Sequence, residues 1–268
     1  MSEDAEDAFA AVADELRVRI LQALWDAEDP LSFSELRDRV DVRDSGRFNY
    51  HLGELRGRFV EQTEDGYELR FAGMKLVTAL HSGIYTEDVS VGPAPVDGEC
   101  VVCGGDLEVH YEDERGRVDC VDCEMAVIST GVPPAFVDGR EDDLAAAIDG
   151  YVRSTQRKFA DGFCPACSGS TTGRLEDGEH GPQMLYTCDR CGGEFQGLVA
   201  AAVVDHTEVV AFYHEHGHDV RDIPVWELDW FDDAGWDGDH AVVTVSLDGD
   251  ELALTVDENL DVVGSERA

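Results

Sequence analysis

All eight cysteines of the chain fall into four Cys-x-x-Cys pairs, with no cysteine left over. The pairs are Cys100/Cys103, Cys120/Cys123, Cys164/Cys167 and Cys188/Cys191. Two thiolates separated by two residues can hold one side of a tetrahedral Zn²⁺ ion, and a second pair 16 or 20 residues later can complete the four ligands. The spacing therefore predicts two zinc ribbons, with two structural Zn²⁺ ions per chain.

The residues that follow each pair match a zinc knuckle more closely in the second ribbon than in the first. Gly104-Gly105 follow Cys103, and Gly192-Gly193 follow Cys191. A knuckle turns its backbone N–H groups toward the sulfurs and needs a residue that tolerates positive φ, as glycine does. The second knuckle of the first ribbon continues into Glu124, so it lacks this glycine.

Four cysteines per ion leave no coordination position open for water, which argues against hydrolytic zinc and against an enzyme. Few apolar residues lie between the knuckles, so we expect the metal to stabilise the fold rather than to act as a sensor. A thiol redox enzyme with Cys164-Pro-Ala-Cys167 as its active pair ranks last, because a redox site would need one pair rather than four at ribbon spacing. A further metal site is disfavoured at a histidine cluster around the end of a predicted helix, formed by His206, His214, His216 and His218.

The 268-residue chain is strongly acidic, with 59 Asp and Glu residues against 20 Lys and Arg residues and a net charge of -39. In molar salt the Debye length falls to about 3 Å, which screens the self-repulsion of such a surface. The composition predicts a halophilic, archaeal source. The N-terminus shows no signal peptide and the chain has no run of 18 apolar residues, so we expect a cytoplasmic protein without a membrane span. Cysteines in that reducing setting favour metal binding over disulfides.

The first 80 residues show the pattern of three helices followed by a hairpin. The helical stripe of residues 5–27 includes Phe9, and Asp14 is placed to cap a second helix within it. Ser32-Phe-Ser-Glu35 forms a capping box for a helix through Val40, and a third helix is expected over 44–56. Strands over 59–63 and 66–71 flank an Asp-Gly turn, and a closing helix over 72–80 follows. This order predicts a winged helix-turn-helix.

The remainder of the chain has the pattern of a loose internal repeat. After a loop over 91–96, each ribbon is followed by a strand and then a helix, first over 126–130 and 140–160, then over 198–204 and 207–216. The alternation of residues 243–247 and 252–256 around Asp248-Gly249-Asp250 predicts a C-terminal β-hairpin. The predicted fold class is α+β, with these domains: winged helix 1–85, ribbon 96–130, linking helix 131–162, ribbon 163–204, and helix plus hairpin 205–268.

Several segments of the first 80 residues resemble the ArsR-type winged-helix transcriptional regulators, and the whole layout resembles haloarchaeal members with a cysteine-rich C-terminal region. The segments are Ala13-Asp-Glu-Leu-Arg-Val-Arg-Ile-Leu-Gln-Ala-Leu24, Phe33-Ser-Glu-Leu36, Asn49-Tyr-His-Leu-Gly-Glu-Leu55 and Gly66-Tyr-Glu-Leu-Arg70. The resemblance implies a homodimeric regulator whose helix with Tyr50-His51-Leu52 enters the major groove of double-stranded DNA, while the wing contacts the flanking backbone. The family's metal-sensing members carry cysteines on the preceding helix, and residues 36–40 here contain none.

The charge pattern favours DNA binding by the same segment. Residues 37–75 contain eight basic and eight acidic residues, so this segment is neutral within an acidic chain. We expect arginines here to contact phosphates and polar side chains to reach base edges. The predicted DNA contacts are Arg43, Ser45, Arg47, Asn49, Tyr50, His51 and Arg58.

Two alternatives stay open for this region. Tyr50 and His51 could simply pack the helix, with the arginines paired to acidic neighbours. An interaction module of the transcription machinery, similar to archaeal TFIIE-alpha-like factors, also joins a winged helix to a zinc ribbon and need not recognise sequence. A second ribbon and the terminal hairpin depart from that layout, so the leading hypothesis is a sequence-specific transcriptional regulator.

Overall fold

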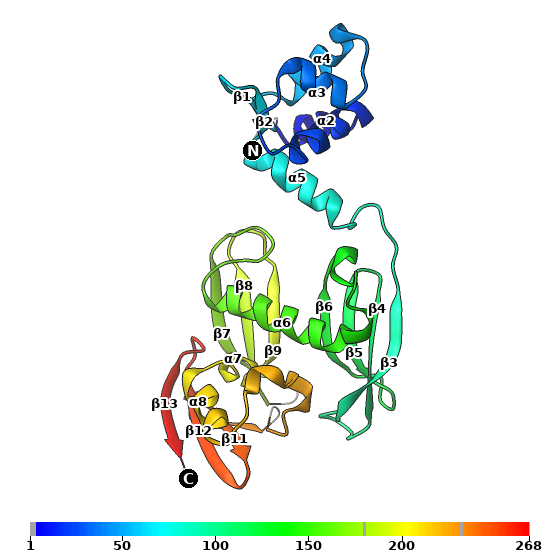
Figure 1. The fold of residues 1–268 in the computed structure, drawn as a ribbon. Helices are drawn as coiled ribbons and strands as arrows, with labels where there is room; N and C mark the ends of the chain where they lie inside the picture. Colours follow the sequence, from blue (N-terminus) through cyan, green and yellow to red (C-terminus); the bar gives the residue numbers. More distant parts are fainter. Residues whose placement is uncertain (1–3, 179–180, 231–232, 268) are drawn as a thin grey trace. The chain divides into compact units, whose positions relative to one another are not determined.

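The computed structural model describes residues 4–178, 181–230 and 233–267 (Figure 1). The chain forms two compact units. The first contains the residues up to Asp88 together with Pro133–Phe136, and the second contains the rest. Within the described residues, no helix is long and apolar enough to cross a membrane.

The first unit is built from five helices and one hairpin within its described residues. They are α1 (Asp4–Ala10), α2 (Glu15–Trp25), α3 (Phe33–Arg39), α4 (Ser45–Leu55), β1 (Val60–Gln62), β2 (Tyr67–Leu69) and α5 (Phe71–His81), with a short 3-10 turn at Pro134–Phe136. Local capping explains where the helices begin. The Asp14 carboxylate accepts from the N–H groups of Leu16 and Arg17, and Ser32 and Glu35 form the predicted capping box. The predicted helices and the hairpin are confirmed.

The core of the first unit is closed by one apolar face from each of α2, α3 and α4. Ile20, Leu36, Phe48 and Leu52 are all buried with at most 1% of their surface exposed. The expectation that Phe9 shares this face is wrong, because its side chain is 74% exposed. The chain leaves the helix after Ala10 and turns before α2 begins, so the helical period does not carry through.

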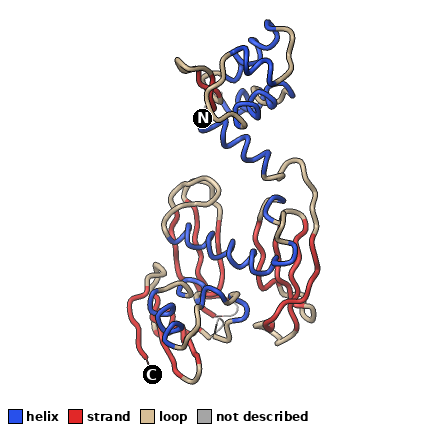
Figure 2. The backbone as a smooth tube through the Cα atoms, viewed as in Figure 1, coloured by secondary structure: helices blue, strands red, loops and turns tan. Residues whose placement is uncertain are grey.

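Among its described residues the second unit contains three antiparallel sheets, whose strands are red in Figure 2. Neighbouring strands in sequence are also neighbours in each sheet. The first sheet has β3 (Val91–Glu99), β4 (Asp106–Glu112), β5 (Arg115–Cys120) and β6 (Ala126–Gly131), and the second has β7 (Thr171–Gly178), β8 (Gly181–Cys188) and β9 (Glu194–Leu198). The third has β10 (Ala234–Asp237), β11 (His240–Leu247), β12 (Asp250–Val256) and β13 (Val262–Arg267).

Two predictions for this unit are wrong. Residues 91–96 belong to strand β3 rather than to a loop, because β3 is an edge strand, where Pro93 and Pro95 can lack an N–H on the unpaired side. Residues 198–204 are not a strand: β9 ends at Leu198 and helix α7 covers Ala200–Val203. Three consecutive alanines have high helix propensity, and this apolar run is buried as a helical turn.

The other elements of the second unit follow the predictions. Helices α6 (Leu144–Ala160) and α8 (Thr207–Glu215) lie where expected, and the hairpin of β11 and β12 pairs Val243 with Leu254 across an Asp248-Gly249 turn. That hairpin is extended on both sides by β10 and β13 into a four-stranded sheet. Short 3-10 turns cover Glu141–Asp143, Val220–Asp222 and Val225–Glu227.

Helix α6 joins the two cysteine-bearing sheets, across which it lies in Figure 1. Near its start, Ile148 packs over Gly116 of β5, where a Cβ would lie 2.9 Å from the Ile148 side chain. Near its end, the Phe159 ring stacks on Phe195 of β9 at 5.8 Å and lies 6.2 Å from the Tyr186 ring. The helix therefore fixes the two sheets in one unit.

One buried arginine ties the same helix to the following segments. Arg153 Nε donates to Asp149 at 2.8 Å, and its other nitrogens donate to Asp205 at 3.3 Å and to the carbonyl of Ile223 at 2.7 Å. Asp149 also accepts from the backbone N–H of Val225 at 2.9 Å. Burial raises the pKa of Asp149, and the Arg153 charge opposes that rise.

Candidate metal sites and nucleic-acid interface

The eight cysteines gather into two clusters of four, as the sequence predicts. In each cluster the four Sγ atoms lie within 4.8 Å of one another. The closest pairs are Cys103–Cys120 and Cys167–Cys188 at 3.5 Å, and Cys100–Cys123 and Cys164–Cys191 at 3.7 Å. A tetrahedral ion with metal–sulfur bonds of about 2.3 Å places its sulfurs about 3.8 Å apart, whereas a disulfide needs about 2.05 Å. Each cluster therefore fits one metal ion.

All four knuckles have the same backbone conformation, including the two in which the residue after the second cysteine is not glycine. In each, the residue after the second cysteine has positive φ: 68° at Gly104, 59° at Glu124, 58° at Ser168 and 70° at Gly192. Its N–H donates to the carbonyl of the first cysteine, with N–O distances from 2.8 to 3.1 Å. The metal-binding turn therefore imposes a left-handed conformation on two residues that have a Cβ.

In each cluster, backbone N–H groups lower the pKa of one buried cysteine and so favour its thiolate form. The N–H of Cys191, followed by that of Arg190, lowers the pKa of Cys188 to about 6 against the opposing effect of burial. The N–H of Cys123 does the same for Cys120, whose pKa falls to about 7. Such thiolates are the form that binds a metal ion.

The strained knuckle of the first cluster gives a stability prediction. Left-handed backbone costs an L-residue roughly 1–2 kcal/mol, so Glu124→Gly is expected to stabilise the metal-loaded second unit by about 1 kcal/mol. For a unit of this size, that raises the melting temperature by about 2–4 °C in thermal unfolding followed by circular dichroism. The equivalent residue Gly192 has open space around it, so Gly192→Ala should lower the melting temperature by a similar amount. Equal shifts of the same sign in both variants would refute the explanation by strain.

Each cysteine cluster and the strands that carry it form a module, and the two modules share one strand register. Leu107, four residues after Cys103, pairs with Cys120, and Thr171, four residues after Cys167, pairs with Cys188. Residues directly before the first cysteine pair alike, Glu99 with Asp106 and Phe163 with Ser170. The two ribbons thus repeat one another in strand register, with the long strand β3 as an addition to the first module, whereas the strand predicted over 198–204 is absent from the second.

The four histidines after the second ribbon belong to neither of the cysteine clusters. Among the described residues, the two cysteine clusters are the groups whose metal-binding side chains come within reach of one ion. His206 caps α8 by accepting from the N–H of Glu208. His216 is held between the Phe212 carbonyl at 2.8 Å and Asp250 at 3.1 Å, which together raise its pKa. These side chains stabilise the ends of a helix.

Most of the residues expected to contact DNA lie on the open side of α4 or just before it. Ser45, Arg47, Asn49 and Tyr50 are exposed on the helix, and Arg43 is exposed in the preceding loop. The alternative in which Tyr50 packs in the core is wrong, because 59% of its surface is exposed.

The other two residues of the predicted set lie deeper. Arg58 is half-buried. His51 is only 8% exposed, and its Nδ1 accepts from Arg17 Nε at 3.2 Å. Helical periodicity places His51 on the side of Phe48 and Leu55, so its ring packs against the unit rather than pointing outward.

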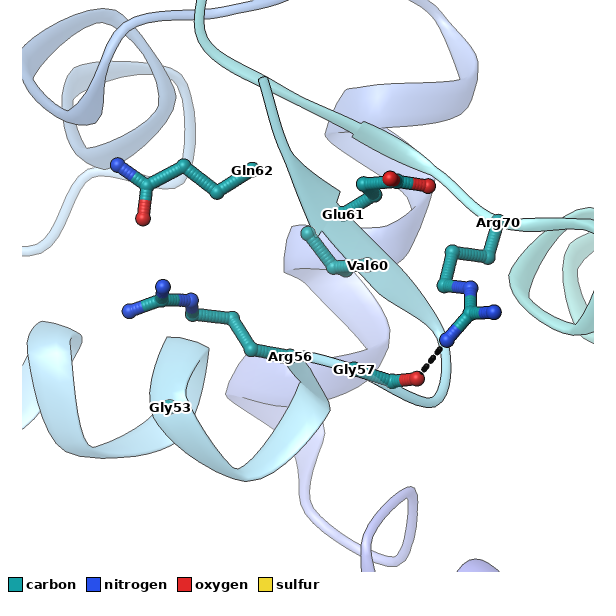
Figure 3. Close-up of a pocket in the computed structure, with 7 residues that line it drawn as sticks. All are labelled: Gly53, Arg56, Gly57, Val60, Glu61, Gln62 and Arg70. Atoms are coloured by element: carbon teal, nitrogen blue, oxygen red, sulfur yellow. Dashed lines mark hydrogen bonds between the residues drawn. The ribbon is translucent and has the colours of Figure 1, made fainter. Parts of the chain in front are cut away.

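A pocket of about 560 Å³ lies between the end of α4 and strand β1, and sequence reasoning missed it. Figure 3 shows the Arg56 and Gln62 side chains extending in the same direction past Gly53, while Arg70 is held by a hydrogen bond to the Gly57 carbonyl. Gly53 has no atom within 4 Å of its missing Cβ, so an incoming group can approach the backbone there. The signal in the sequence was the pair of glycines, Gly53 and Gly57, on either side of Arg56.

Three arginines of this surface stand out because no acidic side chain holds them. In the described part of the chain, five basic side chains make no ion pair, hydrogen bond or ring contact: Arg43, Arg47, Arg56, Lys158 and Arg190. The chain has almost three acidic residues for each basic one. Unpaired arginines in such a composition are available for an anion from outside.

Comparison with known families divides the chain in the same way as the fold. A family model described as a domain of unknown function, DUF7351, matches residues 97–262, which is more than half of the chain. The chain belongs to the DUF7351 family. A second model, the domain of unknown function DUF7347, matches residues 5–80. The search of curated proteins finds no match.

The two matches separate the two candidate sites. The DUF7351 region contains all eight cysteines and both clusters, whereas the DUF7347 region contains the exposed face of α4 and the pocket beside it. Each candidate site therefore lies wholly within one family region.

Proposed function

We propose that this chain is a sequence-specific DNA-binding transcriptional regulator. In this proposal the first unit is a winged helix-turn-helix, in which α4 enters the major groove and the β1–β2 hairpin contacts the flanking backbone. The helices and hairpin follow one another in the order that this class requires, and α4 presents a polar, glycine-containing outer face. The resemblance to ArsR-type regulators supports the same assignment.

The observation that carries the proposal is the set of unpaired arginines at α4. Arg43 and Arg47 lie at the start of the helix and Arg56 at its end, so they can contact phosphates on both sides of a groove. Asn49 is exposed between these points, and the side chains of Asn49 and Arg47 are of the types that make bidentate contacts to adenine and guanine. In the pocket, Arg56 and Gln62 add a donor pair beside the hairpin.

The second unit is proposed to hold two Zn²⁺ ions as structural centres. Four-cysteine sites are closed to substrate, and the ion would replace a core that the short strands cannot form alone. The regulator is further proposed to act as a cytoplasmic homodimer. Phe71 and Met74, exposed on α5 at 72% and 41%, offer apolar surface for a second copy.

The proposal is tested by Arg47→Ala in the metal-loaded protein. We expect affinity for a duplex from the chain's own promoter to fall by about 1–3 kcal/mol, roughly fivefold to 150-fold, while affinity for random duplex changes less. Fluorescence anisotropy at constant salt measures both. Arg37→Ala is the matched control, because Arg37 on α3 is paired with Asp38 at 3.0 Å and should be neutral. Equal binding of promoter and random duplex by the parent protein would contradict the proposal.

A further inference from the structure

The shared register of the two cysteine modules allows their side chains to be compared position by position. The residue before the first cysteine is Glu99 in the first module and Phe163 in the second. The third position of the second knuckle is Asp122 in the first module and Arg190 in the second. The geometry confirms this equivalence: a Cβ on Gly105 would lie 2.4 Å from the Asp122 carboxylate, and one on Gly169 would lie 2.8 Å from Arg190 Cβ.

The fold does not require an aromatic ring or a cation at these positions, because the first module forms the same turns with two acidic residues. Phe163 is nevertheless 62% exposed, which is costly for a ring of this size. Within the described residues, Phe163 makes no ring contact and the Arg190 side chain has no ion pair or hydrogen bond. Both side chains are therefore open to a partner.

The segment that leads into the second module has more basic than acidic residues, whereas the whole protein has the opposite balance. Residues 150–174 contain four basic residues and one acidic residue; within the described residues, carboxylates pair with Arg153, Arg157 and Arg174 but not with the fourth. Of these, Lys158 is exposed and unpaired at the end of α6, and its carbonyl accepts the N–H of Phe163 at 2.9 Å. Phe163 also pairs with Ser170, whose carbonyl accepts the N–H of Asp189, the residue before Arg190, at 3.0 Å. Lys158, Phe163 and Arg190, which we call the knuckle face, thus supply an open ring and two free cations from neighbouring segments.

We propose that the knuckle face binds single-stranded nucleic acid. A base stacks on the exposed Phe163 ring, while Arg190 and Lys158 hold the flanking phosphates, which is the combination by which proteins bind single strands without reading their sequence. A duplex keeps its bases stacked inside and offers no open base for this ring. An acidic peptide would satisfy the two cations but would leave Phe163 without a flat partner. This activity is separate from duplex recognition by α4.

The test measures binding of fluorescein-labelled oligo(dT) and oligo(U) to the full-length, metal-loaded chain by anisotropy at constant salt. Exchange of the face for the residues of the first module, Phe163→Glu with Arg190→Asp, is expected to weaken binding at least about tenfold. Phe163→Ala and Arg190→Ala should each weaken it about fivefold, and all variants should keep two metal ions per chain. Affinity for oligo(dT) in the parent should also fall steeply as salt rises.

Two controls separate this proposal from others. Glu99→Ala with Asp122→Ala, at the matching positions of the first module, should leave affinity within about threefold. Arg47→Ala should leave oligo(dT) binding intact, so a failure of duplex recognition by α4 is distinguishable from a failure here. No oligonucleotide binding by the parent, unchanged binding by the double exchange, or binding of poly-glutamate in preference to both oligonucleotides would each overturn the proposal.

Discussion

A Cys188→Ser variant is expected to bind one metal ion per chain instead of two and to lose the β7–β9 sheet. Cys188 ends β8, is buried, and carries a sulfur whose pKa is lowered to about 6, chiefly by the backbone N–H of Cys191. A structural zinc site contributes about 10–16 kcal/mol of apparent binding free energy at neutral pH, which is as large as the whole stability of an ordinary domain. Weakening one ligand therefore removes the main stabilisation of this module.

The measurement combines metal analysis with amide hydrogen exchange. In the parent, the amides of Met184, Leu185 and Tyr186 on β8 should be protected, and Cys188→Ser or an excess of chelator should expose them. Cys191→Ser is a comparison variant of intermediate effect. Because Cys191 is exposed, its loss should reduce the protection of these amides less than the loss of Cys188 does. Asp189→Ser, in the same knuckle, should keep both ions. Two ions and full protection in Cys188→Ser would contradict a structural role for the cluster.

An Arg153→Met variant is expected to destabilise the second unit by about 3–5 kcal/mol, because it leaves a buried carboxylate without its partner. Asp149 is 5% exposed and Arg153 is 7% exposed, so water cannot replace the lost ion pair. The same substitution also removes donors to Asp205 and to the Val220 and Ile223 carbonyls, which link α6 to the segment after α8. Chemical denaturation of the metal-loaded chain measures the change.

The pH dependence of the stability of Arg153→Met shows whether the unpaired Asp149 carboxylate causes the loss. Burial raises the folded-state pKa of Asp149 above its ordinary value, and loss of Arg153 removes the charge that opposes this rise. The folded state then takes up a proton more readily than the unfolded state, so the stability lost at neutral pH should be partly regained as pH falls. Arg157→Met, one turn further along α6, is the control: Arg157 also pairs with Asp205 but is 61% exposed, and its loss should cost at most about 1 kcal/mol. Equal effects of the two variants would contradict a special role for the buried pair.

Features that depend on near neighbours in sequence were predictable. The four cysteine pairs, the Asp14 cap, the Ser32–Glu35 capping box and the Asp248-Gly249 turn each involve groups only a few residues apart. Their geometry follows from bond lengths and backbone angles, so residue type and spacing are enough. The same reasoning indicates two four-cysteine sites, since two sulfurs from one knuckle cannot complete a tetrahedral ion.

The tertiary structure alone decided which side chains are buried and which are free. His51 and Tyr50 are adjacent in the sequence, yet one contacts Arg17 inside the unit and the other is exposed. Pro93 lies in a strand because β3 is an edge strand that pairs with β4, and within the described residues no acidic side chain pairs with Arg190. Composition and spacing thus determined that this chain has two four-cysteine clusters, each able to hold a metal ion, and an excess of acidic residues. Its two candidate nucleic-acid surfaces were decided by packing, because a charge is available to a partner only where the folded chain leaves it unpaired.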